Sequence, residues 1–104
     1  MIVKRIMQVI GIKPECLNAY CKLHAHIWPD VANAIKQAHL TNYSIHYLNG
    51  QLIQYMEYTG ENFAQDMQRL SQCEAMQRWC SVCKTMQVPD SGQWTDAAEV
   101  FYLG

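Results

Sequence analysis

The sequence predicts one α+β domain in which strands and helices follow the order β-α-β-β-α-β. The chain has 104 residues, 50% of them hydrophobic, which suits a single small core. Apolar, β-branched segments alternate along it with segments whose apolar residues recur every three or four positions. An Asn-Gly pair, the strongest short hairpin signal, joins two strand-like segments near the middle.

The first half of the chain predicts a strand followed by a broken helix. Residues 3–10 are apolar and β-branched, and we expect Gly11 to end this strand. Pro14 suits the first turn of the helix that follows. Pro29 disfavours α geometry at Trp28, so we expect the helix to break there and then to resume.

The middle of the chain predicts a β-hairpin. Residues 41–48 alternate and are rich in Tyr and Ile, and residues 51–59 are predicted to be their antiparallel partner. Asn49-Gly50 supplies the turn between them, and Gly60 is expected to end the second strand.

The second helical part is also predicted to be split. Residues 62–70 place apolar side chains on one helix face. Ser71 is a candidate N-cap for a second helix that reaches about residue 86, with Glu74 in the capping-box position. Residues 88–92 are predicted to form a loop.

The last predicted strand covers residues 97–103 and completes the order of a ferredoxin-like fold with split helices. Helices cover one face of such a four-stranded sheet, so the other face needs a different cover. A second copy of the chain is the usual solution, and a charged fraction of only 16% fits it. We therefore expect a homodimer, a dimeric α+β barrel.

The net charge and the cysteine content indicate which partners and which cellular compartment to expect for this protein. A net charge of −1 argues against nucleic-acid binding, and no apolar run reaches the roughly 18 residues of a membrane span. The N-terminus carries charges inside its apolar stretch, which is typical of a strand rather than a signal peptide. An odd number of cysteines suggests free thiols in a reducing cytoplasm; these are Cys16, Cys21, Cys73, Cys80 and Cys83.

One predicted helix carries an aromatic stripe that could serve chemistry. Tyr20, His24 and Trp28 are spaced i, i+4 and i+8, and therefore share a helix face. Core packing around a hydrogen-bonded histidine is one interpretation. The other is proton transfer, because imidazole is the side chain best matched to that task near neutral pH.

Two further patterns suggest other chemistry and are disfavoured. His24-Ala-His26, with His39 and His46, invites a metal site, but helical residues two apart point about 200° apart and do not converge. The C-x-x-C of Cys80 and Cys83 lies within a helix rather than at its N-terminus, where a redox thiol is favoured, so we interpret it as core packing. Tyr and Trp side chains suit sugars as well as ordinary packing.

Several motifs along the chain together resemble the L-rhamnose mutarotases, small cytoplasmic proteins of a dimeric ferredoxin-like fold. They span nearly the whole length in order: Met7-Gln8-Val9, Tyr20 with His24, Ile27-Trp28-Pro29, Asn42-Tyr43-Ser44-Ile45, Gln77-Arg78-Trp79, and Glu99-Val100-Phe101-Tyr102-Leu103.

The resemblance implies interconversion of the anomers of a free 6-deoxy aldose, most of all L-rhamnose, without cofactor or metal. It implies that His24 is the proton donor, that Tyr20 and Tyr43 contact the sugar, and that Trp79 and Cys80 line its pocket. Cys80 stands where the family has a second tryptophan, and His26 where it usually has proline. The alternatives are an L-fucose mutarotase, a haem-degrading or quinone-forming monooxygenase of similar architecture, and a non-catalytic binding module.

Overall fold

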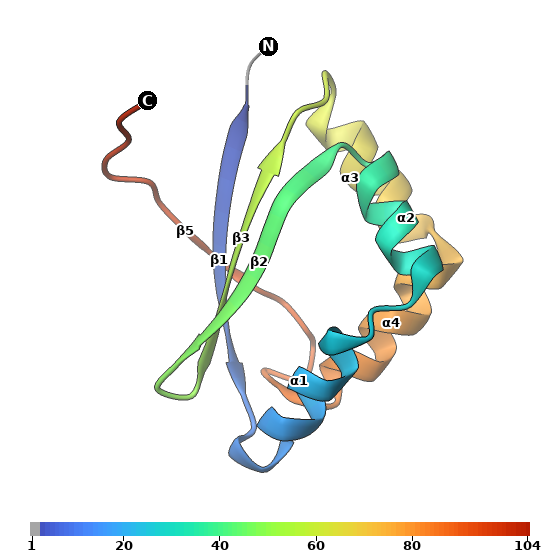
Figure 1. Ribbon diagram of the computed structural model, residues 1–104, viewed down its shortest axis with the longest axis vertical. Coiled ribbons are helices and arrows are strands. Elements are labelled where there is room, and N and C mark those ends of the chain that lie inside the picture. Colours follow the sequence, from blue (N-terminus) through green and yellow to red (C-terminus); the bar gives the residue numbers. More distant parts are fainter. Residues whose placement is uncertain (1–2) are drawn as a thin grey trace.

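A single antiparallel sheet curls around a set of helices that cover one of its faces (Figure 1). The computed structural model describes residues 3–104. The sheet has the order β2-β3-β1-β4, and β5 also pairs with β1. This arrangement confirms the ferredoxin-like α+β class predicted from the sequence. The strands are β1 (Lys4–Ile12), β2 (Leu40–Leu48), β3 (Gln51–Tyr58), β4 (Gln87–Val88) and β5 (Thr95–Ala97).

Both helical parts are split, as predicted. The first begins with a 3-10 turn, η1 (Pro14–Cys16), and continues as α1 (Leu17–Ala25) and α2 (Pro29–Gln37). Trp28 is extended, with φ −64° and ψ 132°, because the following proline excludes α geometry. Helix α1 ends at Ala25, so Trp28 lies in the connection rather than in the helix that we predicted to reach it.

The second helical part divides at a different residue from the one predicted. Helix α3 (Phe63–Gln72) contains Ser71, and α4 (Glu74–Lys84) begins after Cys73, which gives it no side-chain cap. The predicted capping box at Ser71 is therefore wrong. Its hydroxyl donates to the carbonyl of Gln68 instead, at 2.7 Å, because α3 runs through this position.

The Asn-Gly turn confirms the predicted hairpin between β2 and β3. Asn49 has φ 50° and Gly50 has φ 82°, the pair of positive values that a type I′ turn requires. Gly11 does not end β1 as predicted; it pairs with Val88 of β4 inside the sheet. A Cβ atom at Gly11 would lie 2.8 Å from the Val88 carbonyl oxygen, so this glycine permits a close approach of two strands.

The C-terminal strand predicted at residues 97–103 is wrong in its extent. Strand β5 ends at Ala97, and the residues beyond it leave the sheet (Figure 1). Arg5 holds this tail, which we define as residues 98–104, through a bidentate ion pair with Glu99 at 2.7 and 2.9 Å and a stack over Tyr102 at 3.3 Å. The apolar tail side chains stay open to solvent: Val100 is 95% exposed.

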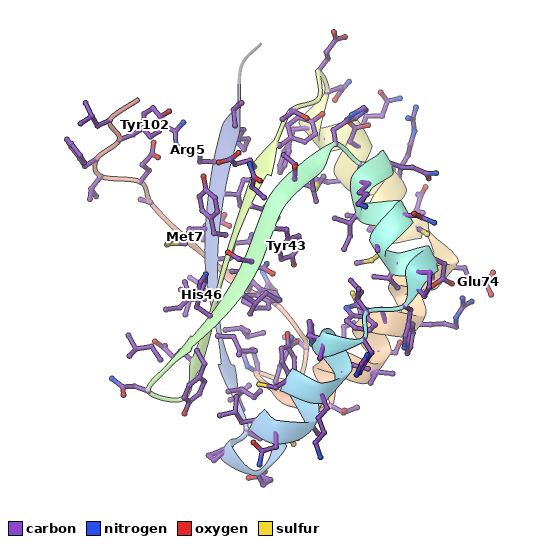
Figure 2. The ribbon with its side chains drawn as sticks, viewed as in Figure 1. Arg5, Met7, Tyr43, His46, Glu74 and Tyr102 are labelled. Carbon is purple, nitrogen blue, oxygen red and sulfur yellow. The ribbon has the colours of Figure 1, made fainter. Side chains whose placement is uncertain are left out.

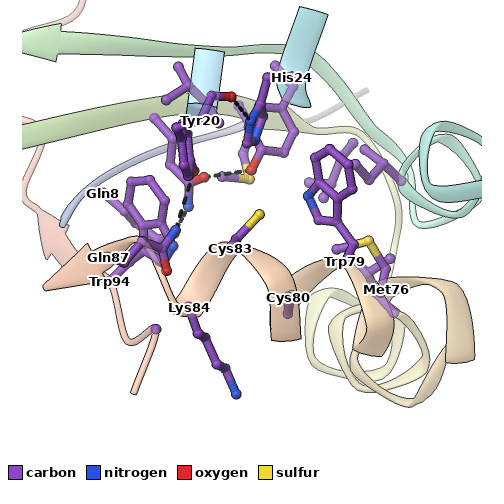
Figure 3. Close-up of a pocket in the computed structure, with 18 of the residues that line it drawn as sticks. Gln8, Tyr20, His24, Met76, Trp79, Cys80, Cys83, Lys84, Gln87 and Trp94 are labelled. Carbon is purple, nitrogen blue, oxygen red and sulfur yellow. Dashed lines mark hydrogen bonds between the residues drawn. The ribbon is translucent and has the colours of Figure 1, made fainter. Parts of the chain in front are cut away.

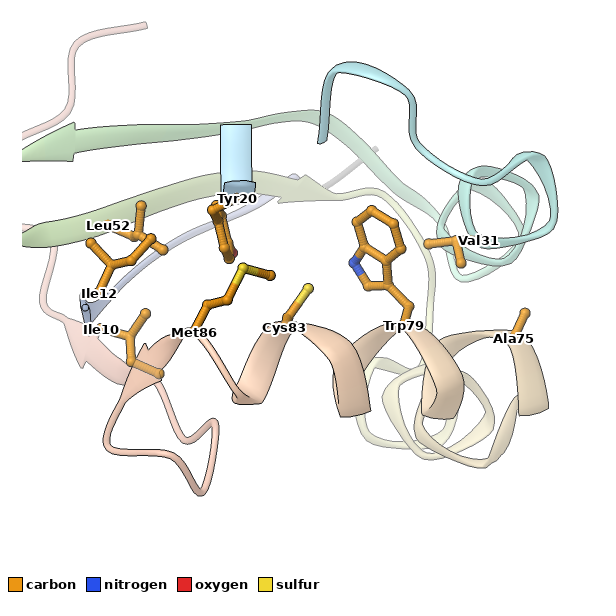
Figure 4. Packing of buried hydrophobic residues seen from close by; sticks show 9 residues of the cluster. All are labelled: Ile10, Ile12, Tyr20, Val31, Leu52, Ala75, Trp79, Cys83 and Met86. Atoms are coloured by element: carbon orange, nitrogen blue, oxygen red, sulfur yellow. The ribbon is translucent and has the colours of Figure 1, made fainter. Parts of the chain in front are cut away.

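The main core lies between the helices and the inner face of the sheet (Figure 4). Strand β3 shows the alternation clearly, since Leu52, Met56 and Tyr58 are buried on the helix side. No described helix covers the opposite face, where Figure 2 places Met7 and His46. None of the helices within residues 3–104 has the length and apolar character needed to cross a bilayer. The main core cluster comprises Ile10, Ile12, Tyr20, Val31, Leu52, Ala75, Trp79, Cys83 and Met86.

Candidate functional site

A cavity of about 240 Å³ lies between the inner face of the sheet and helices α1 and α4 (Figure 3). A neighbouring hollow of about 440 Å³ shares several of its walls and lies between α2 and β2. The first volume suits a ligand somewhat smaller than a drug molecule. The residues common to both hollows are His24, Ile35, Leu40, Tyr43, Ile45 and Trp79.

The His24 imidazole has one nitrogen committed and one nitrogen free. Its Nδ1 lies 2.9 Å from the carbonyl oxygen of Tyr20, one helical turn earlier. A carbonyl only accepts, so Nδ1 carries the proton and neutral His24 presents a lone pair at Nε2. Among the described residues Nε2 has no hydrogen-bond partner, and it is not buried. It is therefore free to exchange a proton with a molecule in the cavity.

Aromatic neighbours fix the orientation of this imidazole. The ring of Tyr20 stacks on it at a centroid distance of 4.1 Å, and Trp79 of α4 meets it edge-on at 4.9 Å. Burial lowers the pKa of His24 below its ordinary value of 6.5, and the hydrogen bond to the Tyr20 carbonyl opposes this effect only in part. The imidazole is therefore neutral at pH 7 and begins as a proton acceptor.

Tyr20 lies deep in the same cavity, with 4% of its surface exposed. Its hydroxyl accepts a hydrogen bond from Nε2 of Gln87 at 3.3 Å. Burial raises its pKa to about 12, so the phenol stays protonated. Because its oxygen accepts from Gln87, its own O–H is left to donate into the cavity.

Tyr43 enters the cavity from the sheet because of a β-bulge in β2. The pairing register between β2 and β3 shifts between Thr41 and Ser44, so Asn42 and Tyr43 share one position opposite β3. Asn42 has φ 47° and turns its amide to Glu57, at 2.7 Å. The Tyr43 side chain points inward, and its hydroxyl donates to Oε1 of Gln54 at 2.5 Å. Tyr43 leaves 38% of its surface exposed, but its hydroxyl end is desolvated inside, and this raises the pKa of Tyr43.

Helix α4 supplies the opposite wall. Trp79 is buried and also packs edge-on against Trp28, at a centroid distance of 5.0 Å. Cys80 and Cys83 line the cavity one and four residues later. Cys83 is buried, which raises its pKa to about 12, and partial desolvation also raises the pKa of the more exposed Cys80. Neither thiol is therefore an activated nucleophile.

The other histidines lie apart from the cavity, so the four do not converge. His26 caps the C-terminal end of α1, His39 lies in the turn before β2 with φ 64°, and His46 bonds to Ser44 at 3.0 Å. Within residues 3–104, no group of three His, Cys, Asp or Glu side chains is arranged to hold a metal ion.

Comparison with known proteins gives this arrangement a family. The model of the L-rhamnose mutarotase family matches residues 5–103. The chain belongs to this family.

The mutarotase relatives match along nearly their whole length. An L-rhamnose mutarotase of Lactiplantibacillus plantarum is 30% identical over 95% of this chain and 97% of its own. One from Pectobacterium carotovorum is 32% identical over 91% of this chain and 93% of its own. The crystal structure of an L-rhamnose mutarotase from Formosa agariphila shares the fold, with a TM-score of 0.81 at 20% identity, over 97% of this chain and 99% of that one.

The structure brings together all the mutarotase site residues named from the sequence. His24, Tyr20, Tyr43, Trp79 and Cys80 line one cavity. The cavity is also lined by four residues that were not predicted: Gln8, Gln54, Gln87 and Trp94. The available signal was Gln54, a polar residue in the inward row of β3 between Leu52 and Met56.

Proposed function

We propose that this chain is a mutarotase that interconverts the α and β anomers of a free 6-deoxy aldose, with L-rhamnose as its substrate. The observation that carries the proposal is the free Nε2 of His24, whose ring is held between the rings of Tyr20 and Trp79 in a cavity of monosaccharide size. Membership of the L-rhamnose mutarotase family supports the same reaction.

A single imidazole can move both protons in this reaction. Neutral His24 takes the proton of the anomeric hydroxyl at Nε2 while the bond between C1 and the ring oxygen breaks. C1 becomes an aldehyde carbon, and the imidazolium donates its new proton to the former ring oxygen. The C1–C2 bond then rotates, and the reverse steps close the ring on the other face of C1. The anomeric hydroxyl oxygen and the ring oxygen are both bonded to C1 at the start, so Nε2 of His24 can reach both. His24 acts as the proton donor when it protonates the former ring oxygen.

The remaining cavity residues would hold the sugar during ring opening. Tyr20 of α1 and Tyr43 of β2 offer hydroxyls to the cavity, and Trp79 offers an apolar wall to the C–H face of the ring. Cys80, in the position of the second tryptophan of the family resemblance, lines the cavity together with Trp79. This departure changes the surroundings of the sugar hydroxyls, and L-fucose differs from L-rhamnose only in the configuration of its hydroxyls. L-fucose is therefore the second candidate substrate.

The test is anomer exchange measured by saturation-transfer proton NMR. Purified protein at neutral pH is mixed with equilibrated L-rhamnose, with L-fucose, and with glucose as an unrelated aldose. We expect faster transfer between the anomers of L-rhamnose, in proportion to protein concentration. Faster exchange between the anomers of L-fucose alone would show that L-fucose, and not L-rhamnose, is the substrate. Binding of a sugar without acceleration, or a haem-coloured purified protein, would overturn the mutarotase proposal.

We also propose that the chain works as a homodimer, in which a second copy covers the outer face of the sheet. Met7 on this face is 43% exposed, and the tail beside it exposes Phe101 by 78% and Leu103 by 81%. A groove of about 300 Å³ lies between the tail and this face. The tail has strand-forming residues but no strand partner in one copy, which a second copy would provide.

Light scattering coupled to size-exclusion chromatography tests the homodimer. We expect twice the mass of the chain at micromolar concentration, and the chain mass for Phe101→Asp, with Asp90→Asn as a control at an exposed loop position. A wild-type monomer would contradict the proposal.

We infer a cytoplasmic location from the five free cysteines. The net charge of −1 supports the expectation that nucleic acid and membranes are not partners. Titration of the unfolded, non-reduced protein with a thiol reagent should give five reactive thiols, and a smaller number would contradict the reducing compartment.

A further inference from the structure

Four side chains form a hydrogen-bonded chain across the sheet, from the cavity to the C-terminal edge strand. The Tyr43 hydroxyl donates to Gln54 at 2.5 Å, and Nε2 of Gln54 donates to Oε1 of Gln8 at 2.6 Å. Nε2 of Gln8 then donates to the carboxylate of Asp96 at 2.7 Å. The sheet register aligns these residues, since Gln8 is the direct partner of Gln54 on β3 and of Asp96 on β5.

The carboxylate at the far end sets the direction of every bond in this chain. An ionised carboxylate only accepts, so Gln8 must turn its amide nitrogen to Asp96. The carbonyl oxygen of Gln8 is then left for the amide nitrogen of Gln54, and the carbonyl oxygen of Gln54 for the Tyr43 hydroxyl. The carboxylate therefore determines which end of each glutamine amide is the oxygen and which is the nitrogen, so the two orientations do not depend on an arbitrary choice between them.

The direction of these hydrogen bonds decides whether the Tyr43 hydroxyl can donate to a bound molecule or only accept from it. Its only hydroxyl proton is committed to Gln54, so it faces the cavity with lone pairs alone. Successive bonds in one direction strengthen each other, which makes the phenol oxygen a better acceptor. Tyr20 has the opposite character, because its oxygen accepts from Gln87 and leaves its proton to donate.

We propose that Asp96, Gln8 and Gln54 are positioning residues that hold Tyr43 as a hydrogen-bond acceptor for one hydroxyl of the sugar. The inference rests on the proposed function for the identity of the ligand. Asp96 is exposed and does not line the cavity, so it acts through the chain and not by contact. Gln54, in contrast, is 6% exposed, and its amide has little choice but to bond within the chain.

The variant Asp96→Asn tests the direction of these hydrogen bonds, because asparagine has nearly the same shape as aspartate. An asparagine amide can donate, so all three bonds can reverse, and Tyr43 is no longer held as an acceptor. We expect KM for the sugar to rise about threefold to tenfold, the effect of one weakened hydrogen bond, with kcat within twofold. Asp90→Asn, the same charge change at an exposed loop position, should leave both constants unchanged.

A double-mutant cycle separates action through Tyr43 from a merely structural role. In a Tyr43→Phe background, Asp96→Asn should change KM by less than about 1.5-fold, because the hydroxyl it controls is gone. An equal rise in KM in both backgrounds, or no rise in the wild-type background, would overturn the inference.

Proton NMR of the free protein gives a readout that does not depend on the reaction. We expect a downfield hydroxyl resonance that is absent from Tyr43→Phe, shifted in Asp96→Asn and unchanged in Asp90→Asn. A resonance that does not shift in Asp96→Asn would refute the hydrogen-bonded chain from Asp96 to Tyr43, even if the protein exchanges the sugar anomers. A wild-type protein that shows the resonance but no anomer exchange would refute only the proposed function.

Discussion

Replacing His24 by phenylalanine removes the proton-transferring nitrogen and keeps an aromatic ring in its place. The rings of Tyr20 and Trp79, at 4.1 and 4.9 Å from the imidazole, can pack against phenylalanine as well. We expect the rate of anomer exchange to fall roughly 10²–10⁴-fold, the range for a general acid–base group. At about 1.36 kcal/mol per factor of ten, this is a loss of about 2.7–5.4 kcal/mol of transition-state stabilisation.

The matched variant His24→Ala separates catalysis from packing. It should lose the same activity and also two aromatic contacts worth about 0.5–1.5 kcal/mol each. At about 4–8 °C per kcal/mol for a domain of this size, Tm should fall by roughly 4–24 °C in His24→Ala and by much less in His24→Phe. Saturation-transfer NMR and thermal unfolding followed by circular dichroism measure the two effects. A folded His24→Phe protein with full activity would refute the assignment of His24.

The pKa of His24 lies below its ordinary value of 6.5, so kcat/KM should decline as pH falls, with the midpoint of the decline below pH 6.5. A rise in activity with acid would contradict a neutral imidazole. Below about pH 6.5 the unfolded chain binds more protons at His24 than the folded chain does, so the free energy of unfolding should fall as pH falls. The variant His24→Phe should lose this part of the pH dependence. Leu52→Ala, at 2% exposure, should lower the free energy of unfolding in urea by about 2–5 kcal/mol, whereas Leu48→Ala, at 58%, should change it by less than about 0.5; equal losses would show that the core is misplaced. Gly11→Ala should cost about 1–3 kcal/mol in the same assay, because its Cβ would meet the Val88 carbonyl at 2.8 Å, and a neutral result would mean that β4 does not approach β1 so closely.

Local spacing predicted one half of the site well. Tyr20 and His24 are four residues apart in one helix, and that spacing alone places the two rings together. The broken helix at Trp28 followed from the backbone restriction that proline imposes on the preceding residue. The meeting of these residues with Trp79 is a tertiary contact, and it entered the sequence analysis only through the family resemblance.

The sheet half of the site could not be predicted from alternation. The bulge at Asn42 adds one residue to β2, so a regular alternation of faces fails to show how Tyr43 enters the cavity. The partners of Gln54 are Tyr43 on β2 and Gln8 on β1, so they depend on the register of three strands, which no single segment contains. The strand predicted at residues 97–103 has the right residue types, but one copy of the chain provides no neighbour for them.

Exchange of the anomers of L-rhamnose in this cavity is tested by measuring the exchange rate at rising protein concentration. We expect the rate to increase linearly with the concentration of wild-type protein and to stay near the buffer rate with the same concentrations of His24→Phe. A rate that remains at the buffer value for wild-type protein, or that rises equally for both proteins, would contradict it.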